Sequence, residues 1–163
     1  MKRDDFSEFF GVPKDFFSTL KNWKKFREHS AVYFFLIDPP EKRKQMESDI
    51  VYIGETKHLG GISGNCRLWD YYTRSGDHEI EKVAFMRNLS VDHKAMISWL
   101  PCLNKPIAKE LEDALLNAFW EEHGENPPLN RTTPMTRDQT WGISVDGALE
   151  TMRKMKTQGH IFP

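Results

Sequence analysis

Glu112 places an acidic side chain at the border of an apolar helix face. Four of its neighbours at three-, four- and seven-residue spacing are apolar: Leu115, Leu116, Phe119 and Ala108. A carboxylate in this position has to be hydrogen-bonded, ion-paired or bound to a metal ion, because desolvating an unpaired charge costs several kcal/mol. Metal binding is therefore one prospect for Glu112, and a glutamate that simply reaches water is the other.

Three phenols and one guanidinium form a second set of candidates. Tyr33 and Tyr52 each interrupt an apolar run, in two segments that are expected to be neighbouring strands. Arg67 and Tyr71 are four residues apart in an expected helix, which places them on one face. Positive charge near a phenol favours its ionised form, so this set could take part in proton transfer. The alternatives are buried tyrosines with satisfied hydroxyl groups and a structural stack of arginine on tyrosine.

The strands that must position the phenols follow from hydrophobic patterning. Residues 31–37 and 50–53 are short apolar runs rich in β-branched and aromatic side chains, which is typical of buried strands. The polar stretch between them predicts an antiparallel hairpin with a long exposed tip at 41–49. A third strand is expected at 94–103.

The expected helices surround these strands. The longest begins after Asn104, an N-cap residue, has Pro106 in its first turn, and ends before Gly124. Helical segments are expected at 13–27, 66–74, 79–88, 104–122 and 148–156. Together these elements predict an α/β (α+β) fold in which a small central three-stranded antiparallel sheet is flanked by helices, with helical additions at both ends.

The length and net charge of the chain limit the number of domains and the kinds of partner that can be expected. A chain of 163 residues predicts one domain, and 23 Lys and Arg against 24 Asp and Glu give a net charge of −1. Affinity for nucleic acid therefore has to come from local patches. Segment 13–27 is one candidate, either as a solvated face or as a phosphate-facing patch, because it carries Lys14, Lys21, Lys24, Lys25 and Arg27.

The cellular compartment is predicted from the targeting and membrane-spanning segments that the sequence does not show. No apolar run approaches the roughly 18 residues that span a bilayer, and the first residues lack the apolar segment of a secretory signal. The protein is therefore expected in the cytoplasm, without a membrane partner. Cys66 and Cys102 are isolated, which favours reduced thiols over a disulfide or zinc site.

In their order along the chain, the candidate residues resemble the GIY-YIG nuclease family. The first triplet of the family corresponds to residues 31–33 (Ala-Val-Tyr) and the second to residues 52–54 (Tyr-Ile-Gly). The helix arginine of the family corresponds to Arg67, with Tyr71 at a position where members carry histidine or tyrosine. The first triplet departs from the pattern, since alanine and valine replace glycine and isoleucine.

The second half of the resemblance involves Glu112 and Asn130. Glu112 precedes a pair of leucines as the acidic residue of the family does, and Asn130 follows a proline by two residues. The resemblance implies a catalytic domain at 31–131, between an N-terminal helical extension at 1–30 and a C-terminal loop and short helix at 132–163. The hairpin and the Gly-rich loop before Arg67 are longer than in minimal members.

The resemblance implies a metal-dependent endonuclease that hydrolyses phosphodiester bonds in DNA. Glu112 would bind one divalent cation, Mg²⁺ or Mn²⁺, and Arg67 would donate hydrogen bonds to the phosphate. Tyr33 is the expected base or water-positioning group, Tyr52 its partner, and Tyr71 a proton relay.

Supporting roles are implied for three further residues. Gly54 and Lys57 would lie against the substrate, and Asn130 would brace the helix that carries Glu112. Single-stranded and double-stranded substrates, DNA and RNA, and a monomer or a homodimer all remain open. The alternative function is a non-cleaving nucleic-acid-binding or protein-interaction module on the same scaffold.

Overall fold

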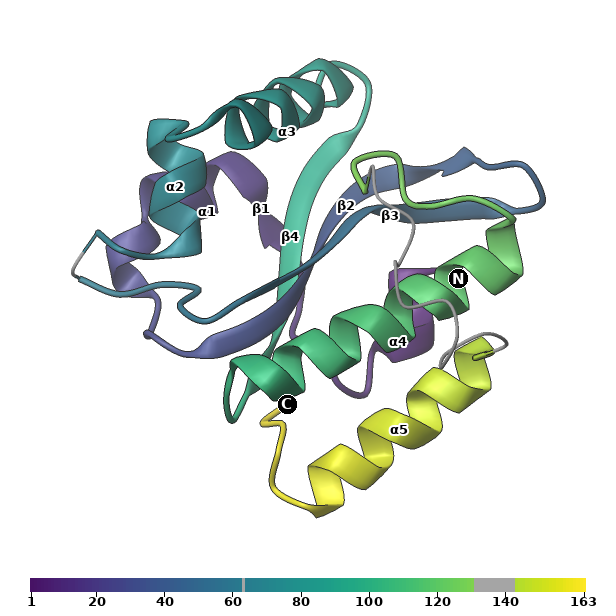
Figure 1. The fold of residues 1–163 in the computed structure, drawn as a ribbon. Coiled ribbons are helices and arrows are strands. Elements are labelled where there is room, and N and C mark those ends of the chain that lie inside the picture. Colours follow the sequence, from purple (N-terminus) through teal and green to yellow (C-terminus); the bar gives the residue numbers. More distant parts are fainter. Residues whose placement is uncertain (63, 131–142) are drawn as a thin grey trace.

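The apolar runs of the chain form the strands of one antiparallel sheet (Figure 1). The computed structural model describes residues 1–62, 64–130 and 143–163. In these ranges the sheet has four strands in the order β1-β4-β2-β3. Their bounds are β1 (Lys14–Asp15), β2 (Ser30–Lys42), β3 (Glu47–Thr56) and β4 (Lys94–Cys102). The predicted α+β class is confirmed, and the predicted three strands gain a fourth of two residues at one edge.

The β2–β3 hairpin is longer than predicted. Both strands run past the expected ends, with Lys42 opposite Glu47, so the expected tip at 41–49 shrinks to residues 43–46. Pro39 and Pro40 do not stop β2, because they lie beyond its pairing with β4 and inside a register shift with β3. Proline has no backbone N–H group, and at these two positions no neighbouring strand needs that donor.

The helices follow the predicted order, with one exception near the N-terminus. The helix N-cap Asn104 accepts a hydrogen bond from the Ile107 N–H at 3.0 Å, and Gly124 ends that helix with a φ of 67°. Short 3₁₀ turns form at η1 (Arg3–Phe6) and η2 (Trp23–Lys25). The α-helices are α1 (Phe16–Lys21), α2 (Arg67–Thr73), α3 (Asp77–Leu89), α4 (Lys105–His123) and α5 (Val145–Thr157).

The single helix predicted at 13–27 is wrong. Lys14 and Asp15 form β1 against β4, and only then does α1 begin. The Asp15 side chain accepts the Ser18 N–H at 2.6 Å and so caps this helix, which ends before Asn22. The helical spacing of the apolar residues in 13–27 did not reveal that Lys14 and Asp15 form the edge strand of the sheet.

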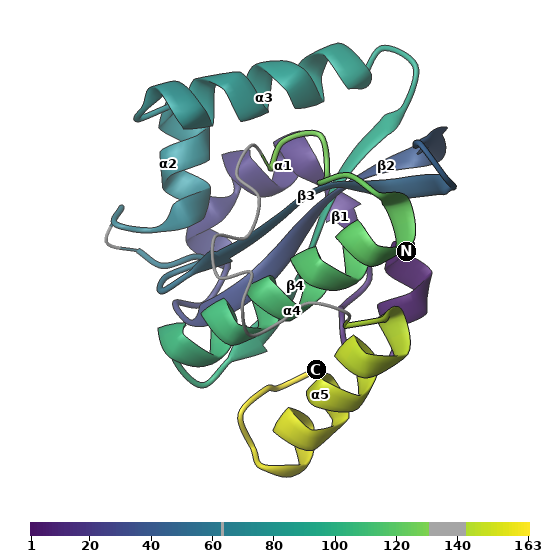
Figure 2. The same cartoon turned by 45° about the vertical axis from the view of Figure 1, so that its right-hand side comes forward.

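The sheet separates two layers of helices (Figures 1 and 2). Side chains alternate along each strand. On the first face Tyr33 and Phe35 pack beneath α1, α2 and α3, and on the second face Val32 and Phe34 pack against α4, α5 and the N-terminal segment. Residues 1–30 are thus joined to both layers. In the predicted C-terminal segment 132–163, residues 132–142 lie outside the described ranges and the remainder contains α5.

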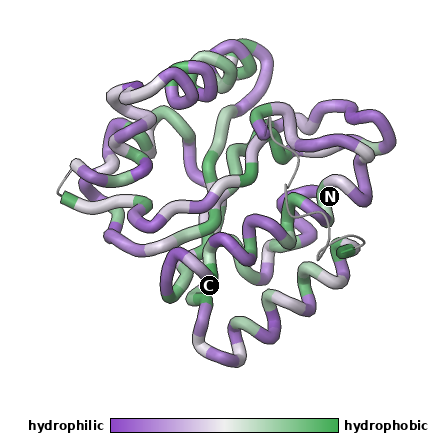
Figure 3. The backbone as a smooth tube through the Cα atoms, in the orientation of Figure 1, coloured by the Kyte–Doolittle hydropathy of each residue, from purple (hydrophilic) through white to green (hydrophobic). Residues whose placement is uncertain are grey.

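Hydropathy follows this arrangement. Figure 3 shows hydrophobic colour along the strands, whereas the tip of the β2–β3 hairpin is hydrophilic. Among the described residues, none of the helices combines the length and the apolar character needed to cross a membrane.

Candidate functional site

The first face of the sheet holds a cluster of three phenols from Tyr33, Tyr52 and Tyr71, here named the phenol cluster. The hydroxyl oxygens of Tyr33 and Tyr71 are 2.9 Å apart, and each of these side chains belongs to a residue that is only 1% exposed. The ring centroids of Tyr33 and Tyr52 are 5.9 Å apart. Tyr52 is half-buried, with the Lys82 ammonium 4.5 Å from its ring centroid. Sequence reasoning therefore named three residues that the fold brings together.

Gly54 makes room for this cluster. The strand register places Tyr33 opposite Gly54, and Tyr52 projects from the same face two residues earlier. A Cβ at position 54 would lie 2.5 Å from Tyr52 Cε1 and 2.8 Å from Tyr33 Cζ, which no side chain allows. The structure thus gives Gly54 a packing role beneath two phenols, and its close approach to substrate stays a prediction.

Arg67 lies at the start of α2, beside the phenol cluster. Its Cζ is 6.0 Å from the Tyr71 ring centroid, and its Nη1 is 3.1 Å from Glu79 Oε1 and 3.8 Å from Asp70 Oδ2. Its Nε is buried and has no hydrogen-bond partner among the described residues. Burial opposes the positive charge, but the three phenols and Asp70 outweigh it and raise the pKa of Arg67. The guanidinium is therefore permanently charged and retains a free donor.

The buried phenols are held in their neutral form. Burial, followed by the neighbouring tyrosines, raises the pKa of Tyr33 well above 10.0, and the nearby Arg67 offsets only part of this effect. Burial likewise raises the pKa of Tyr71 well above 10.0. A neutral phenol donates a hydrogen bond and does not accept a proton from water near neutral pH. Of the two roles predicted for Tyr33, base or water-positioning group, its surroundings therefore favour the second.

The second face holds a different group of side chains, here named the carboxylate cluster: Glu55, Glu112 and Asp113 with Lys105 and Lys109. Lys109 Nζ lies 2.6 Å from Glu112 Oε2 and 2.9 Å from Asp113 Oδ1. Lys105 Nζ lies 3.7 Å from Glu55 Oε1. Burial raises the pKa of Glu112, the Lys109 ammonium opposes this, and Glu55 and Asp113 add to it. The predicted metal ligand is thus ion-paired within its own helix.

The carboxylate cluster has the donor chemistry of a hard-cation site. No group of three or more His, Cys, Asp or Glu side chains suited to a metal ion occurs in the described part of the chain. Glu55 and Glu112 nevertheless supply carboxylate oxygens, and Glu55 Oε2 is buried without a hydrogen-bond partner among the described residues. Mg²⁺ and Mn²⁺ accept such oxygen ligands and keep several waters. These two residues therefore have the ligand chemistry that a divalent cation prefers, and metal binding by them stays a prediction.

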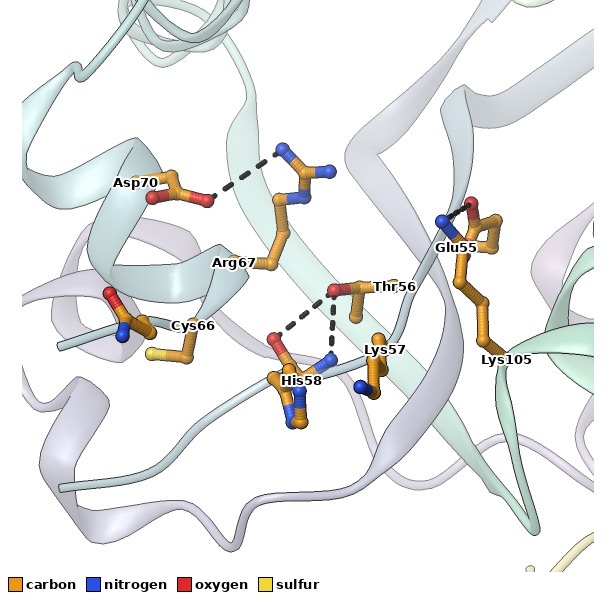
Figure 4. Close-up of a pocket in the computed structure, with 9 residues that line it drawn as sticks. Glu55, Thr56, Lys57, His58, Cys66, Arg67, Asp70 and Lys105 are labelled. Atoms are coloured by element: carbon orange, nitrogen blue, oxygen red, sulfur yellow. Dashed lines mark hydrogen bonds and ion pairs between the residues drawn. The ribbon is translucent and has the colours of Figure 1, made fainter. Parts of the chain in front are cut away.

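A pocket of about 220 Å³ at the end of β3 lies between the two clusters. Figure 4 shows Arg67 and Asp70 on one side of this strand end, and Glu55 with Lys105 on the other. The exposed Lys57 also lines it, as predicted for a substrate-facing residue, whereas Glu112 and the phenols are not among its lining residues. The lining is Glu55, Thr56, Lys57, His58, Asn65, Cys66, Arg67, Asp70 and Lys105.

Sequence reasoning missed Glu55 and Lys105. Glu55 directly follows the second triplet, and Lys105 stands in the first turn of the helix that carries Glu112. These two positions in the sequence are the signals that could have identified Glu55 and Lys105 as site residues. Because neighbours in a strand face opposite sides, Glu55 had to lie away from Gly54 and towards α4.

Asn130 braces a strand rather than the helix that was predicted. Its Oδ1 accepts the Ile53 N–H at 2.9 Å, and its Nδ2 donates to the Ile53 carbonyl at 2.7 Å. The Leu129 N–H donates to the Val51 carbonyl at 3.0 Å. The segment therefore pairs with the open edge of β3, between Tyr52 and Gly54, and holds the strand that carries both clusters.

Comparisons of the chain with protein-family models, with curated proteins and with solved structures found no match.

Proposed function

We propose that this protein is a metal-dependent endonuclease that hydrolyses phosphodiester bonds in DNA through a GIY-YIG-type site. The observation that carries the proposal is the pocket at the end of β3, where the permanently charged Arg67 and the carboxylate of Glu55 line one hollow. Glu55 in turn faces Glu112 in the carboxylate cluster. The ordered motif in the sequence supports the same reading.

Arg67 is the proposed phosphate-binding group. A guanidinium presents a planar fork of donors that suits the nonbridging oxygens of a phosphodiester. Its Nε has no partner among the described side chains, and its Nη1 is already oriented by Glu79. The exposed Lys57 adds a second positive charge at the pocket. Together they neutralise charge that develops on the phosphate as it is attacked.

Glu112 and Glu55 are the proposed holders of the divalent cation. A cation bound there would supply further positive charge for the phosphate and the leaving oxygen. The Lys109 ammonium now satisfies Glu112, so this ion pair has to open before the carboxylate can accept a different cation. In the hydrolysis itself, a water oxygen bonds to phosphorus, the ester P–O bond breaks, and the departing oxygen gains a proton.

The phenol cluster is proposed to position these groups. The hydroxyl pair of Tyr33 and Tyr71 joins β2 to α2, the helix that begins with Arg67. Tyr52 is the member that is only half-buried, and it is therefore the phenol assigned to face the substrate. A rigid support of this kind holds the guanidinium in one place during turnover.

Cleavage assays with a matched pair of variants test the proposal. Purified protein is incubated with plasmid and with oligonucleotides, in Mg²⁺ or in chelator, and the products are resolved on gels. Wild type and Glu110→Gln, which changes an exposed glutamate of the same helix, are expected to cut only with Mg²⁺. Glu112→Gln is expected to lose cleavage entirely while keeping its circular dichroism spectrum. Full activity in Glu112→Gln would overturn the metal assignment.

A second candidate, a nucleic-acid-binding module that does not cut, is favoured by one contact. The 2.6 Å pairing with Lys109 neutralises Glu112 without any metal ion. This candidate predicts oligonucleotide binding that is equal in Mg²⁺ and in chelator, with intact substrate after prolonged incubation.

A further inference from the structure

Three aromatic side chains form a continuous strip across η2 and α2, outside the site described above. The ring centroids of Trp23 and Trp69 are 4.8 Å apart, and those of Trp69 and Tyr72 are 5.9 Å apart with an interplanar angle of 34°. Exposure increases along this aromatic strip: Trp23 is buried, Trp69 is half-buried, and Tyr72 is 49% exposed. Its outer end therefore offers a supported ring face to solvent.

The aromatic strip is flanked by cations that have no acidic partner. Lys24 Nζ lies 5.3 Å from the Trp23 ring centroid, and Lys21, Lys25 and Arg74 are exposed. Within the described ranges, none of these four forms an ion pair with a carboxylate.

The acidic residues nearby are already engaged. Asp70 lies 3.8 Å from Arg67, and Glu28 lies 2.8 Å from the His58 ring nitrogen. Asp15 caps α1. Among the described residues, Lys21, Lys24, Lys25 and Arg74 thus form a local group of cations without carboxylate partners, although the whole chain carries −1.

We infer that the aromatic strip and its cations bind unpaired nucleotides of the nucleic-acid substrate. Tyr72, backed by Trp69, stacks on a base, and Lys24, Lys25 and Arg74 contact the phosphates on either side. This inference rests on the proposed function for its choice of a nucleic-acid partner. It adds a substrate class, namely DNA with a single-stranded segment next to the cleavage site.

Two physical arguments favour an unpaired strand over other partners. Aromatic rings with interleaved basic residues are the usual surface for single strands, because every base has a face that can stack. A continuous duplex hides its base faces and offers Tyr72 only its phosphates. An acidic peptide would satisfy the lysines but has no flat surface for the rings.

The strip is also close enough to act on the same strand as Arg67. Tyr72 and Arg67 are five residues apart in one short helix, and η2 packs on that helix. Five residues of α-helix rise about 7.5 Å, close to the span of one or two nucleotides, and turn by about 140°. A strand lying on Tyr72 therefore has to follow the surface of α2 around to bring a neighbouring phosphate to the pocket.

Binding measurements without cleavage test the inference. The probe is a fluorescein-labelled dT12, followed by anisotropy in chelator, with a 12-base-pair duplex and poly-glutamate as comparison ligands. Wild type is expected to bind dT12 more tightly than either. Tyr72→Ala is expected to weaken dT12 binding roughly 5- to 150-fold, and Tyr72→Phe to restore it, because stacking needs the ring and not the hydroxyl.

Matched controls separate the strip from the general surface. Met46→Ala removes a side chain of similar exposure, 48%, from the hairpin tip and should leave binding unchanged. Lys25→Gln should lower the slope of log K against log salt by about 0.7, as expected for one lost phosphate contact, whereas Lys154→Gln on α5 should not. Equal loss in test and control variants, equal binding of poly-glutamate, or no dT12 binding at all would overturn the inference.

The outcome is independent of catalysis. If dT12 binds through Tyr72 but Mg²⁺ produces no cleavage, the inference about the aromatic strip is supported and the endonuclease proposal is contradicted. If plasmid is cut in a Glu112-dependent manner while Tyr72→Ala binds dT12 normally, the endonuclease proposal stands and the strip fails.

Discussion

The two faces of β3 differ in how their polar groups are satisfied. On the first face Tyr33 and Tyr71 of the phenol cluster are buried and neutral, and their hydroxyl groups pair with each other. On the second face the carboxylate cluster is charged and is satisfied by two lysines whose side chains are half exposed to solvent. The first arrangement contains no charge, whereas in the second a cation has to accompany the largely buried carboxylates of Glu55 and Glu112.

This difference explains where the candidate pocket lies. Gly54 and Glu55 are neighbours in β3 and therefore face opposite layers. Groups from the two layers can meet only where the strand ends, and the pocket that contains both Arg67 and Glu55 lies there. The first face thus acts as a rigid support, and the second supplies ion-binding oxygens.

Within the first layer, the largest expected effect comes from removing Arg67, the group of that layer that reaches the pocket. Arg67→Ala should slow cleavage about 100- to 1000-fold, or roughly 3–4 kcal/mol of transition-state stabilisation, as for loss of one preorganised donor. Single-turnover kinetics at saturating Mg²⁺ measure the change. Arg87→Ala, which removes an exposed arginine from α3, serves as the control, and an unchanged rate in Arg67→Ala would remove this residue from the site.

A smaller effect is expected when the packing of the two faces is disturbed separately. Gly54→Ala forces a methyl group against Tyr33 and Tyr52 and should lower the free energy of unfolding by about 1–3 kcal/mol. Gly11→Ala, where a Cβ meets nothing within 4 Å, should change it little. In the carboxylate cluster, Lys109→Met leaves Glu112, whose side chain is only 12% exposed, without its cation, and should cost about 1–3 kcal/mol near pH 7. Urea denaturation compares the three: the loss in Lys109→Met should shrink as the pH is lowered and Glu112 is protonated, whereas the loss in Gly54→Ala should not, and an equal pH dependence would break the contrast between the faces.

The smallest expected effect is a dependence of stability on alkaline pH. Burial raises the pKa of Tyr33 and Tyr71 in the folded protein above 10.0, so near and above pH 10 the folded state binds more protons than the unfolded chain. Stability contributed by the neutral phenols is complete below pH 10 and is lost as the pH rises from there towards the folded-state values. Denaturation at several pH values from 8 to 11 should show a shallower decline for the Tyr33→Phe, Tyr71→Phe double variant. A decline equal to that of wild type would show that these phenols are not buried as described.

Much of the fold was predictable from local pattern. Asn104 and Gly124 marked the ends of the long helix, and the apolar runs marked β2, β3 and β4. Failures occurred where pairing with a distant strand overruled local signals. Lys14 and Asp15 paired with β4. Strand β2 continued through Pro39 because neither neighbouring strand needs a backbone N–H donor at that position.

The sequence predicted which residues belong to the candidate site but not how they are arranged in space. Strand and helix patterns made Tyr33, Tyr52, Arg67 and Tyr71 candidates, the family resemblance implied one site for them, and the fold gathers these four. The same spacing contained no information on what lies across the sheet. Glu112 therefore entered the prediction as a partner of the phenols, although it lies in the other layer with Lys109 and Glu55.

The amino-acid sequence by itself determined which segments are strands and helices and which side chains are candidates for chemistry, because propensity, capping and periodicity act over a few residues. Only the tertiary structure decided that Asn130 holds the edge of β3, that Gly54 yields its space to two phenols, and that Glu55 and Arg67 share a pocket. These contacts join residues that are far apart in sequence, and their geometry depends on strand register and layer packing, which no local pattern contains.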